Sequence, residues 1–352
     1  MVGRGQGTQR VVVQAKALLE GSCGWVLPEL GAPPGQEEPH RYSASTGPPI
    51  ERQNALRSAH LVSLTLGPPV LSLPGPVVSA EWLSDHLDDP TLVIADVRWY
   101  IDGRSGEAAY DAGHLPGAVW VDLDRDLAGS SGTGPGRHPL PSPGHFAAAM
   151  NRLAVGDGDV VVAYDDAGGS IAARLWWMLT ALGHDVAVLE GGISAWTGEL
   201  SNDLPSERPD SLFTEKPWPL GSTVDVVAVD TLRRGDDAVI LDARSADRYC
   251  GEPNPIDKRL GHIPGAVSAP WNENLDKDTG RFRPVNELRA RFTALGVRHD
   301  RPAVCHCGSG ITACHNLLAL QLAHLPAGRL YPGSWSDWSA DPGRPVQMGD
   351  QP

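Results

Sequence analysis

An internal repeat constrains this chain more than any other feature of its sequence. Three short motifs occur twice, in the same order, and the spacing between the two copies is 142 to 148 residues. The matched pairs are GHLPGAV (113–119) with GHIPGAV (261–267), ADVR ending at Arg98 with LDAR ending at Arg244, and EGGISAW ending at Trp196 with PGSWSDW ending at Trp338. Matches in constant order at nearly constant spacing indicate a tandem duplication, so we expect two similar domains.

Each copy has the residue pattern of an α/β domain. The stretches TLVIADVR (91–98), DVVVAYDD (159–166) and DVAVLEGG (185–192) are short apolar runs typical of buried parallel strands. SAEWLSDHL (79–87) and SIAARLWWMLTALG (170–183) are typical of helices, and the second ends at a glycine, a common helix stop. Strands that alternate with helices predict, for each domain, a parallel sheet flanked by helices.

Composition and the repeat together set the expected domain boundaries. Residues 1–76 contain no Asp, several Pro/Gly clusters and no sustained periodicity. This predicts an extension without stable structure, or a start codon assigned too far upstream. We expect the first domain over residues 77–200, a Pro-rich linker over 201–222 and the second domain over 223–352.

Charge and cysteine content exclude several classes of function. The formal net charge of −14 disfavours a nucleic-acid or anionic-membrane partner, since either would select a basic surface. The sequence has no apolar run of about 18 residues, so we expect no membrane-spanning helix. Five cysteines in 352 residues do not make a disulfide scaffold, and a reducing compartment, the cytoplasm, is the simpler expectation.

One cysteine lies in a position that favours reactivity. The stretch PAVCH (302–306) predicts a buried strand and ITACHNLLALQLAHL (311–325) a helix, so Cys307 lies in the turn between them. Ligands bind at that edge of an open α/β sheet. The Gly-Ser-Gly turn and the positive end of the helix would both stabilise a thiolate, or an anionic sulfur attached to it. The repeat aligns Cys307 with Asp165, so the first copy has lost this chemistry.

Two other chemistries use the same residue types and fit less well. A zinc site is disfavoured because no second Cys-x-x-Cys pair exists. The four residues that such a site would need are Cys305, Cys307, Cys314 and His315. A phosphatase loop would need an arginine near the end of the loop, where this chain has Thr312 and then Ala313. Without that bidentate guanidinium, a phosphoryl group loses its main partner.

These motifs resemble those of the two-domain rhodanese-type sulfurtransferases, and the resemblance covers about residues 77–345. The six-residue loop CGSGIT (307–312) is similar to the Cys-Gly-Ser-Gly-Val-Thr loop of 3-mercaptopyruvate sulfurtransferases, with Ile311 in place of Val. Thiosulfate-preferring members carry Cys-Arg-Lys-Gly-Val-Thr instead. The resemblance therefore implies tandem rhodanese-like domains, an inactive first and a catalytic second, with 3-mercaptopyruvate favoured over thiosulfate as the donor.

The resemblance also implies a mechanism and partners. Cys307 would take a sulfur from a small donor as a persulfide and pass it to a thiol, cyanide or thioredoxin, with no cofactor and no metal. A thiosulfate:cyanide sulfurtransferase is one alternative. A non-catalytic sulfur carrier, which accepts the persulfide from a partner protein, is another, because a carrier would keep the same cysteine.

Further site residues follow from the resemblance, position by position. Ser309 matches the family's proton-relay serine, and His114 matches a histidine expected near it, with Asp102 as its orienting acid. Arg248 matches a substrate-binding arginine. The family's second arginine follows a Glu-Pro-x-Pro motif, where this chain has Ile256. Arg259 is the expected substitute, with Lys258 as the alternative. The remaining loop residues would contact the donor, namely Gly308, Gly310, Ile311 and Thr312.

Overall fold

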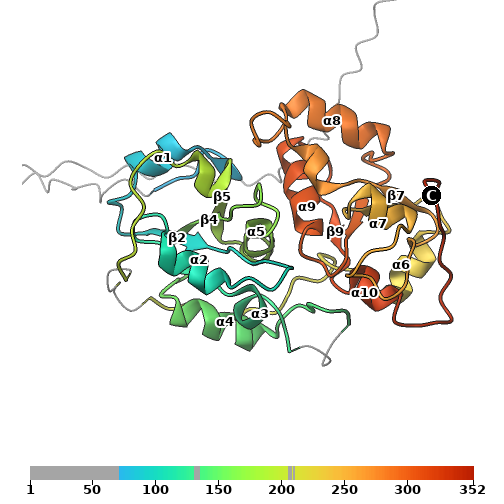
Figure 1. Cartoon of the computed structure of the whole chain (residues 1–352), viewed down its shortest axis with the longest axis horizontal. Coiled ribbons are helices and arrows are strands. Elements are labelled where there is room, and N and C mark those ends of the chain that lie inside the picture. The colour runs from blue at the N-terminus through green and yellow to red at the C-terminus, as the bar shows by residue number, and fades with distance from the viewer. Residues whose placement is uncertain (1–70, 131–134, 205–207, 209–210) are drawn as a thin grey trace, which may run out of the picture. The chain divides into compact units, whose positions relative to one another are not determined.

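The computed structural model describes residues 71–130, 135–204, 208 and 211–352, and these residues belong to one compact unit. Figure 1 colours the first repeat blue to green and the second yellow to red. The first repeat holds a parallel five-stranded sheet in the order β1-β5-β4-β2-β3. Its strands are β1 (Val77–Val78), β2 (Leu92–Asp96), β3 (Val119–Trp120), β4 (Val160–Tyr164) and β5 (Asp185–Leu189).

The second repeat holds a parallel sheet in the order β7-β6-β8-β9. Its strands are β6 (Val239–Asp242), β7 (Ala266–Ser268), β8 (Ala303–His306) and β9 (Arg329–Leu330). This order repeats β3-β2-β4-β5 of the first sheet. Thr223 forms a single parallel bridge to Leu330, where β1 would pair in the first repeat. The equal strand order confirms the predicted pair of α/β domains.

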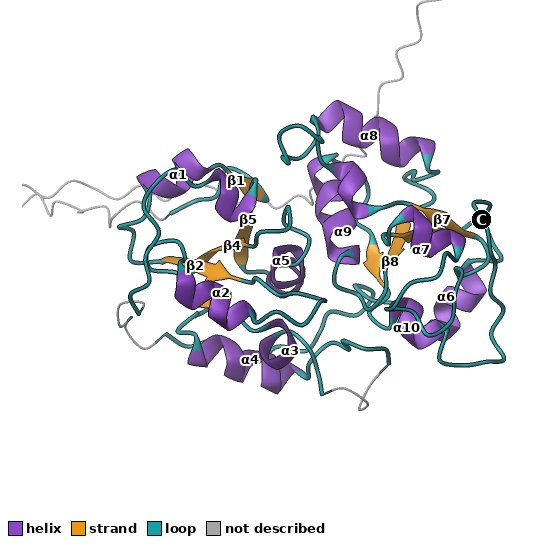
Figure 2. Ribbon diagram, in the orientation of Figure 1, coloured by secondary structure: helices purple, strands orange, loops and turns teal. Residues whose placement is uncertain are grey.

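Helices flank both sheets, as the ribbons in Figure 2 show. The first repeat contains α1 (Ala80–Asp85), α2 (Gly106–Ala112), α3 (Leu123–Asp126), α4 (Pro143–Arg152), α5 (Ala172–Ala181) and the 3-10 helix η1 (Gly192–Ala195). The second contains α6 (Val226–Leu232), α7 (Ala246–Cys250), η2 (Trp271–Asn274), α8 (Val285–Ala294), α9 (Ala313–Leu322) and α10 (Ser334–Trp338). Their apolar faces cover strands that are buried along nearly their whole length.

A buried ion pair at the end of a central strand recurs in both repeats. In the first, the Asp96 carboxylate binds the Arg98 guanidinium at 2.6 Å, and Arg98 also donates to the Gly113 carbonyl. In the second, Asp242 and Arg244 form the same pair at 2.6 Å, and Arg244 donates to the Gly261 carbonyl. Each arginine thereby fastens its GH-L/I-PGA loop to the sheet, which explains why these motifs occur together in both copies.

The linker packs on the first domain. Phe213 is buried against Phe146, and Trp218 lies 6.2 Å from Trp177, ring centroid to centroid. The equivalent helices α5 and α9 pack against each other, so the two repeats share a hydrophobic core. Residues of both repeats therefore meet at the carboxyl ends of β4 and β8.

The first domain begins earlier than the sequence indicated. Residues 1–70 of the expected extension lie outside the described residues. Within the expected extension, however, Leu71 is buried in the core under β1 and Leu73 packs partly against it. The ordered domain therefore includes residues before position 77.

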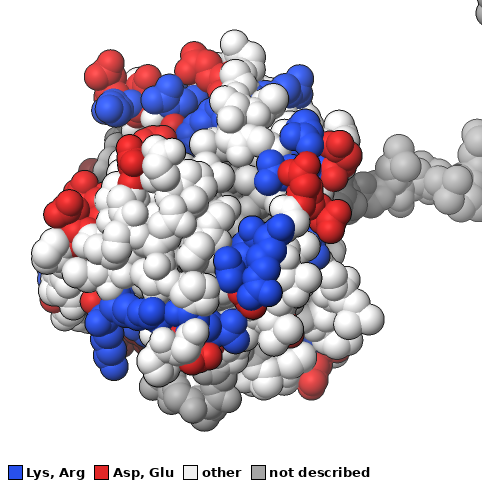
Figure 3. Space-filling view, turned by 90° about the vertical axis from the view of Figure 1, so that its right-hand side faces the viewer, with Lys and Arg blue, Asp and Glu red and all other residues white. Residues whose placement is uncertain are grey.

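Figure 3 shows one face of the molecule, on which acidic and basic side chains are both present. Basic side chains form a row across the lower left of this view and a second group right of its centre. In the part of the chain that the structure describes, none of the helices is long and apolar enough to cross a membrane.

Candidate active site

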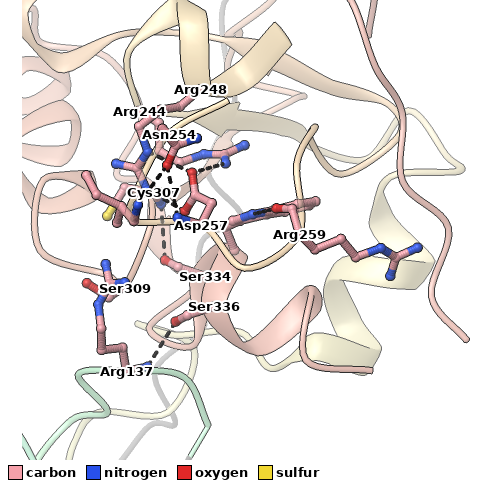
Figure 4. A network of polar contacts seen from close by, with 12 residues as sticks. Arg137, Arg244, Arg248, Asn254, Asp257, Arg259, Cys307, Ser309, Ser334 and Ser336 are labelled. Carbon is pink, nitrogen blue, oxygen red and sulfur yellow. Dashed lines mark hydrogen bonds and ion pairs between the residues drawn. The ribbon is translucent and has the colours of Figure 1, made fainter. Parts of the chain in front are cut away.

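Cys307 is the first residue after β8 and is only 2% exposed. The Gly310 backbone N–H donates to its sulfur at 3.1 Å, and its own N–H donates to the Ser334 hydroxyl. The loop also rests on the start of α10, because the Trp335 N–H donates to the Cys307 carbonyl and the Ser336 N–H to the Gly308 carbonyl. The strand end and α10 together hold the sulfur in a defined position (Figure 4).

Gly310 permits the turn that brings a backbone N–H to the sulfur. Its φ of +81° is in the left-handed region, and a Cβ there would lie 2.5 Å from the Pro332 carbonyl oxygen. Only glycine meets both conditions without displacing the backbone. The Gly-Ser-Gly pattern in the sequence is therefore a geometric requirement of the loop.

The equivalent loop of the first domain is filled by its own side chain. Asp165 follows β4 as Cys307 follows β8, and it is fully buried. One carboxylate oxygen accepts N–H bonds from Ala167 and Gly169, and the other from Ile171 and Ala172, at 2.8 to 2.9 Å. The backbone N–H groups of this loop thus converge on one acceptor, and in the first domain that acceptor is the Asp165 side chain.

Ser309 is part of a hydrogen-bonded chain that crosses from one domain to the other. Its hydroxyl lies 2.8 Å from Nδ1 of His138, and Nε2 of His138 lies 3.1 Å from the Asp124 carboxylate. Trp99 also donates to Asp124, at 2.8 Å. The hydrogen bond from His138 is the main cause that lowers the pKa of Asp124. An ionised Asp124 favours the tautomer with the proton on Nε2, which leaves Nδ1 free to accept the Ser309 proton.

The structure does not place His114 and Asp102 beside Ser309, where the resemblance led us to expect them. His114 is bonded to the carbonyls of Tyr110 and Asp203 and stacks on the Tyr110 ring at 3.9 Å. His262 has the same arrangement on Tyr249, so this histidine serves the fold in both repeats. Asp102 is exposed and pairs with Arg104. The histidine that lies against Ser309 is His138, and the acid that lies against this histidine is Asp124.

Arg248 lies beside Cys307, as its motif predicts. Its Nε and Nη2 atoms bind the two Asp257 oxygens at 2.8 and 2.7 Å. Asp257 also forms an ion pair with Arg244, at 3.4 Å. A chain of ion pairs therefore leads from Asp242 at the end of β6 to Arg248 beside the Cys307 loop. This bidentate pair fixes the guanidinium and leaves Nη1 for another ligand.

Arg259 does not supply the expected second cation. Its guanidinium donates to the carbonyls of Asp341 and Arg344, and Figure 4 shows it directed away from Cys307. Arg137, which the sequence did not single out, reaches up from the first domain towards Ser309 instead (Figure 4).

A small cavity of about 60 Å³ opens over the sulfur. Its wall comes from both domains, and it consists of Trp99, Ile101, Arg137, Ile171, Arg248, Cys307, Gly308, Ser309, Ile311 and Thr312. At roughly 30 Å³ for each water, this volume corresponds to about two waters. The cavity is therefore suited to a compact ligand, and the arginines in its wall favour one with an anionic part.

The other cysteines of the second domain do not share this setting. Burial raises the pKa of Cys314 to about 12 and raises that of Cys305 even further, which keeps both as thiols. His315 is bonded to Asn274 and to the Gly168 carbonyl. Among the described residues, no group of three His, Cys, Asp or Glu side chains is placed to hold a metal ion.

A signal for His138 was present in the sequence. Residues that both repeats share, such as His114 and His262, carry out tasks common to both copies. His138 has no repeat mate and lies in the Pro/Gly-rich stretch between α3 and α4. An unmatched histidine is the better candidate for a function that only one site performs.

Comparison with known proteins agrees with this geometry. The rhodanese-like domain model matches residues 79–199 and 227–341. A Pseudomonas aeruginosa protein named "Probable 3-mercaptopyruvate sulfurtransferase" is 42% identical over 284 residues, which cover 78% of this chain and 98% of the relative. A Mycobacterium tuberculosis relative, SseB, whose name contains thiosulfate sulfurtransferase, is 38% identical over 74% of this chain and 92% of its own length.

A solved structure is similar over both domains. The crystal structure of SseA, a 3-mercaptopyruvate sulfurtransferase from Escherichia coli, matches 74% of this chain and 99% of its own length. The TM-score is 0.66 and the sequence identity is 36%. Both domains and the site between them are therefore within the matched region.

Proposed function

The chain belongs to the rhodanese family of sulfurtransferases, and on that premise we propose that it takes sulfur from 3-mercaptopyruvate and passes it to a thiophilic acceptor through a persulfide on Cys307. The observation that carries this choice of donor is the chain from Ser309 through His138 to Asp124. This hydrogen-bonded chain supports a proton relay beside the proposed nucleophile.

The reaction with this donor balances without an added reagent. The Cys307 thiolate attacks the donor sulfur, the S–S bond forms, and the C–S bond breaks with its electron pair left on carbon as pyruvate enolate. The proton of the donor thiol moves to that carbon, giving pyruvate and an anionic persulfide. Ser309 and His138 accept this proton and return it, which is general acid–base catalysis.

The leaving group explains why the relay supports mercaptopyruvate over thiosulfate. Thiosulfate releases sulfite, a stable anion that needs no proton. An enolate carbon is a much stronger base and requires one. The neutral residues Gly308 and Ser309, with His138 bonded to Ser309, suit an enolate leaving group that needs a proton. Cationic side chains at positions 308 and 309 would instead suit a sulfonate-like dianion.

Acceptors reach the same sulfur in the second half of the reaction. Cyanide, a small thiol or a reduced thioredoxin attacks the outer sulfur and restores the Cys307 thiolate. We place this reaction in a reducing compartment such as the cytoplasm, because Cys250, Cys305, Cys307 and Cys314 are all unpaired thiols.

Steady-state transfer to cyanide, measured as thiocyanate, tests the proposal with mercaptopyruvate and thiosulfate side by side. We expect a higher kcat/KM for mercaptopyruvate, no activity in Cys307→Ser, and normal activity in the matched control Cys250→Ser. Cys250 is only half-buried and lies outside the cavity lining.

The other outcomes identify the alternatives. A thiosulfate preference would keep the nucleophile and make the protein a thiosulfate sulfurtransferase. No turnover of either donor, with a persulfide on Cys307 loaded only by a partner protein, would make it a carrier.

A further inference from the structure

We propose that a second, larger cavity beside the active site binds the body of the sulfur acceptor, and that its occupant is a low-molecular-weight thiol that carries carboxylates. This inference rests on the proposed function, because it assumes that a persulfide on Cys307 is passed to a thiol. It selects one acceptor class, whereas the proposed function leaves the acceptor open between cyanide, small thiols and a reduced thioredoxin.

The two cavities differ about tenfold in size. The larger one has a volume of about 600 Å³, and its wall is formed by residues 136–137 of the first domain and by residues 256–259, 335–336 and 339–340 of the second. Sites that bind small molecules in proteins measure about 300–1,000 Å³. The cavity over the sulfur measures only about 60 Å³. An acceptor larger than a few atoms can therefore place its thiol over Cys307 but needs another space for its body.

The larger cavity shares a wall with the Cys307 loop. Trp335 and Ser336 line it, and their backbone N–H groups donate to the carbonyls of Cys307 and Gly308, both at 2.9 Å. Arg137 lines both cavities, and its backbone N–H donates to the Ser336 hydroxyl (Figure 4). A ligand in the larger cavity therefore lies next to the loop that holds the sulfur.

The charges of the wall favour a ligand with carboxylates. Lys258 is exposed, and among the described residues no carboxylate forms an ion pair with it. The Arg259 guanidinium donates only to two backbone carbonyls. The carboxylate in the wall, Asp257, is bound through both oxygens by Arg248. Lys258 and Arg259 thus give this cavity a positive potential on a chain whose formal net charge is −14.

The transfer balances with the acceptor alone. The acceptor thiol gives its proton to solvent, and the thiolate attacks the outer sulfur of the Cys307 persulfide. A new S–S bond forms, and the bond between the outer sulfur and Cys307 Sγ breaks with its electron pair left on Sγ. The acceptor leaves as a persulfide, and Cys307 returns as a thiolate. No oxidant or reductant is needed.

A binding measurement tests the cavity without any reaction. S-Methylglutathione carries two carboxylates on a tripeptide-sized body, and its thiol is blocked. We expect it to bind the full chain in a calorimetric titration, with a Kd about tenfold higher in Lys258→Glu, because a charge-assisted contact is replaced by repulsion. The matched control is Lys277→Glu, which changes the net charge equally at an exposed lysine outside this cavity wall, and it should keep the wild-type Kd.

A kinetic measurement isolates the second half of the reaction. Cys307 is loaded with inorganic polysulfide, the excess is removed, and the loss of one sulfur from the chain is followed by intact mass spectrometry. Glutathione should react about tenfold faster than its diethyl ester, which has no free carboxylate, and Lys258→Glu should remove this difference. Lys277→Glu should keep it.

Filling the cavity gives a second variant. Ser339 is half-buried in the wall, and Ser339→Trp should slow transfer to glutathione at least about tenfold. Cyanide has only two atoms and fits the small cavity, so its rate should change less than about threefold. A retained cyanide rate also shows that the variant is folded.

The outcomes separate this inference from the proposed function. If mercaptopyruvate does not load Cys307 but polysulfide does, the proposed donor fails, and the acceptor rates still decide the role of the cavity. Equal rates for glutathione and its ester, with no binding of S-methylglutathione, would overturn the inference. So would a Lys258→Glu variant that slows transfer to reduced thioredoxin alone, because the cavity would then belong to a protein interface.

Discussion

Replacing His138 by glutamine is expected to remove most of the sulfur transfer from mercaptopyruvate and little of that from thiosulfate. Glutamine keeps a polar side chain near Ser309 but cannot carry a proton between two partners. Both hydrogen bonds of His138 are already formed, at 2.8 and 3.1 Å, so the substitution should remove the whole contribution of acid–base catalysis by this side chain. That contribution is about 10²- to 10⁴-fold, or about 2.7–5.5 kcal/mol of the barrier.

The assay follows a single turnover without acceptor, as pyruvate released and as persulfide on Cys307 by intact mass spectrometry. Thiosulfate loading should change less than about threefold, since sulfite leaves without a proton. His114→Gln is the matched control, and it should alter thermal stability more than the rate. Asp124→Asn should lose about tenfold, less than His138→Gln, because the Asp124 side chain is 58% exposed and water can replace part of its effect.

Either of two results would refute this reasoning. Equal losses with both donors in His138→Gln would mean that the side chain holds the loop and moves no proton. If His114→Gln lost as much of the loading rate as His138→Gln, His114, the histidine expected from the sequence, would be the better candidate for the proton relay.

Three further predictions concern the framework around the site. Arg174→Met removes the guanidinium that donates to the carbonyls of Leu127, His138 and Gly310, of which Gly310 keeps only a weak bond from the Cys314 S–H. The free energy of unfolding in a denaturant titration should fall by about 2–4 kcal/mol and single-turnover loading should slow, and an unchanged midpoint would show that these bonds contribute nothing. Gly310→Ala places a Cβ 2.5 Å from the Pro332 carbonyl oxygen at a φ of +81°. This variant should lose at least about tenfold in loading rate and about 1–3 kcal/mol of stability. The control Gly280→Ala, also at positive φ but with open space around it, should lose stability alone. Burial lowers the pKa of His315 to about 3 and also lowers that of His306, so the unfolded chain takes up protons on these histidines near pH 6.5 while the folded protein does not. The free energy of unfolding should therefore decrease as the pH falls below about 6.5, by up to about 1.4 kcal/mol per pH unit for each histidine. A flat profile between pH 6.5 and 5 would contradict this.

The fold could be predicted because its signals are local and occur twice. Apolar runs before Asp96 and Asp242 predict strands in each copy, and the recurrent GH-L/I-PGA loop aligns them. Cys307 could be predicted for a similar reason, since a strand, a glycine turn and a helix follow one another directly in the sequence. Each of these features depends on residues close together in the chain.

The rest of the site depends on contacts across the domains, which local patterns do not encode. His138 lies 171 residues from Ser309, in an irregular stretch between α3 and α4, and nothing in its neighbours indicates what it faces. The position of Arg137 at the cavity wall could not be predicted for the same reason. Arg259 had the expected position in the sequence, but its loop directs it to the carbonyls of Asp341 and Arg344.

The carboxylate of Asp165 has a consequence for the stoichiometry of the protein. Since its four N–H bonds fill the loop of the first domain permanently, that loop has no room for a sulfur atom. Under the proposed function, in which the persulfide forms on Cys307, the chain would then carry one sulfur at a time and the first domain could not take part in the transfer. Donor and acceptor would react with the same cysteine in turn, and full loading would correspond to a mass increase of one sulfur per chain.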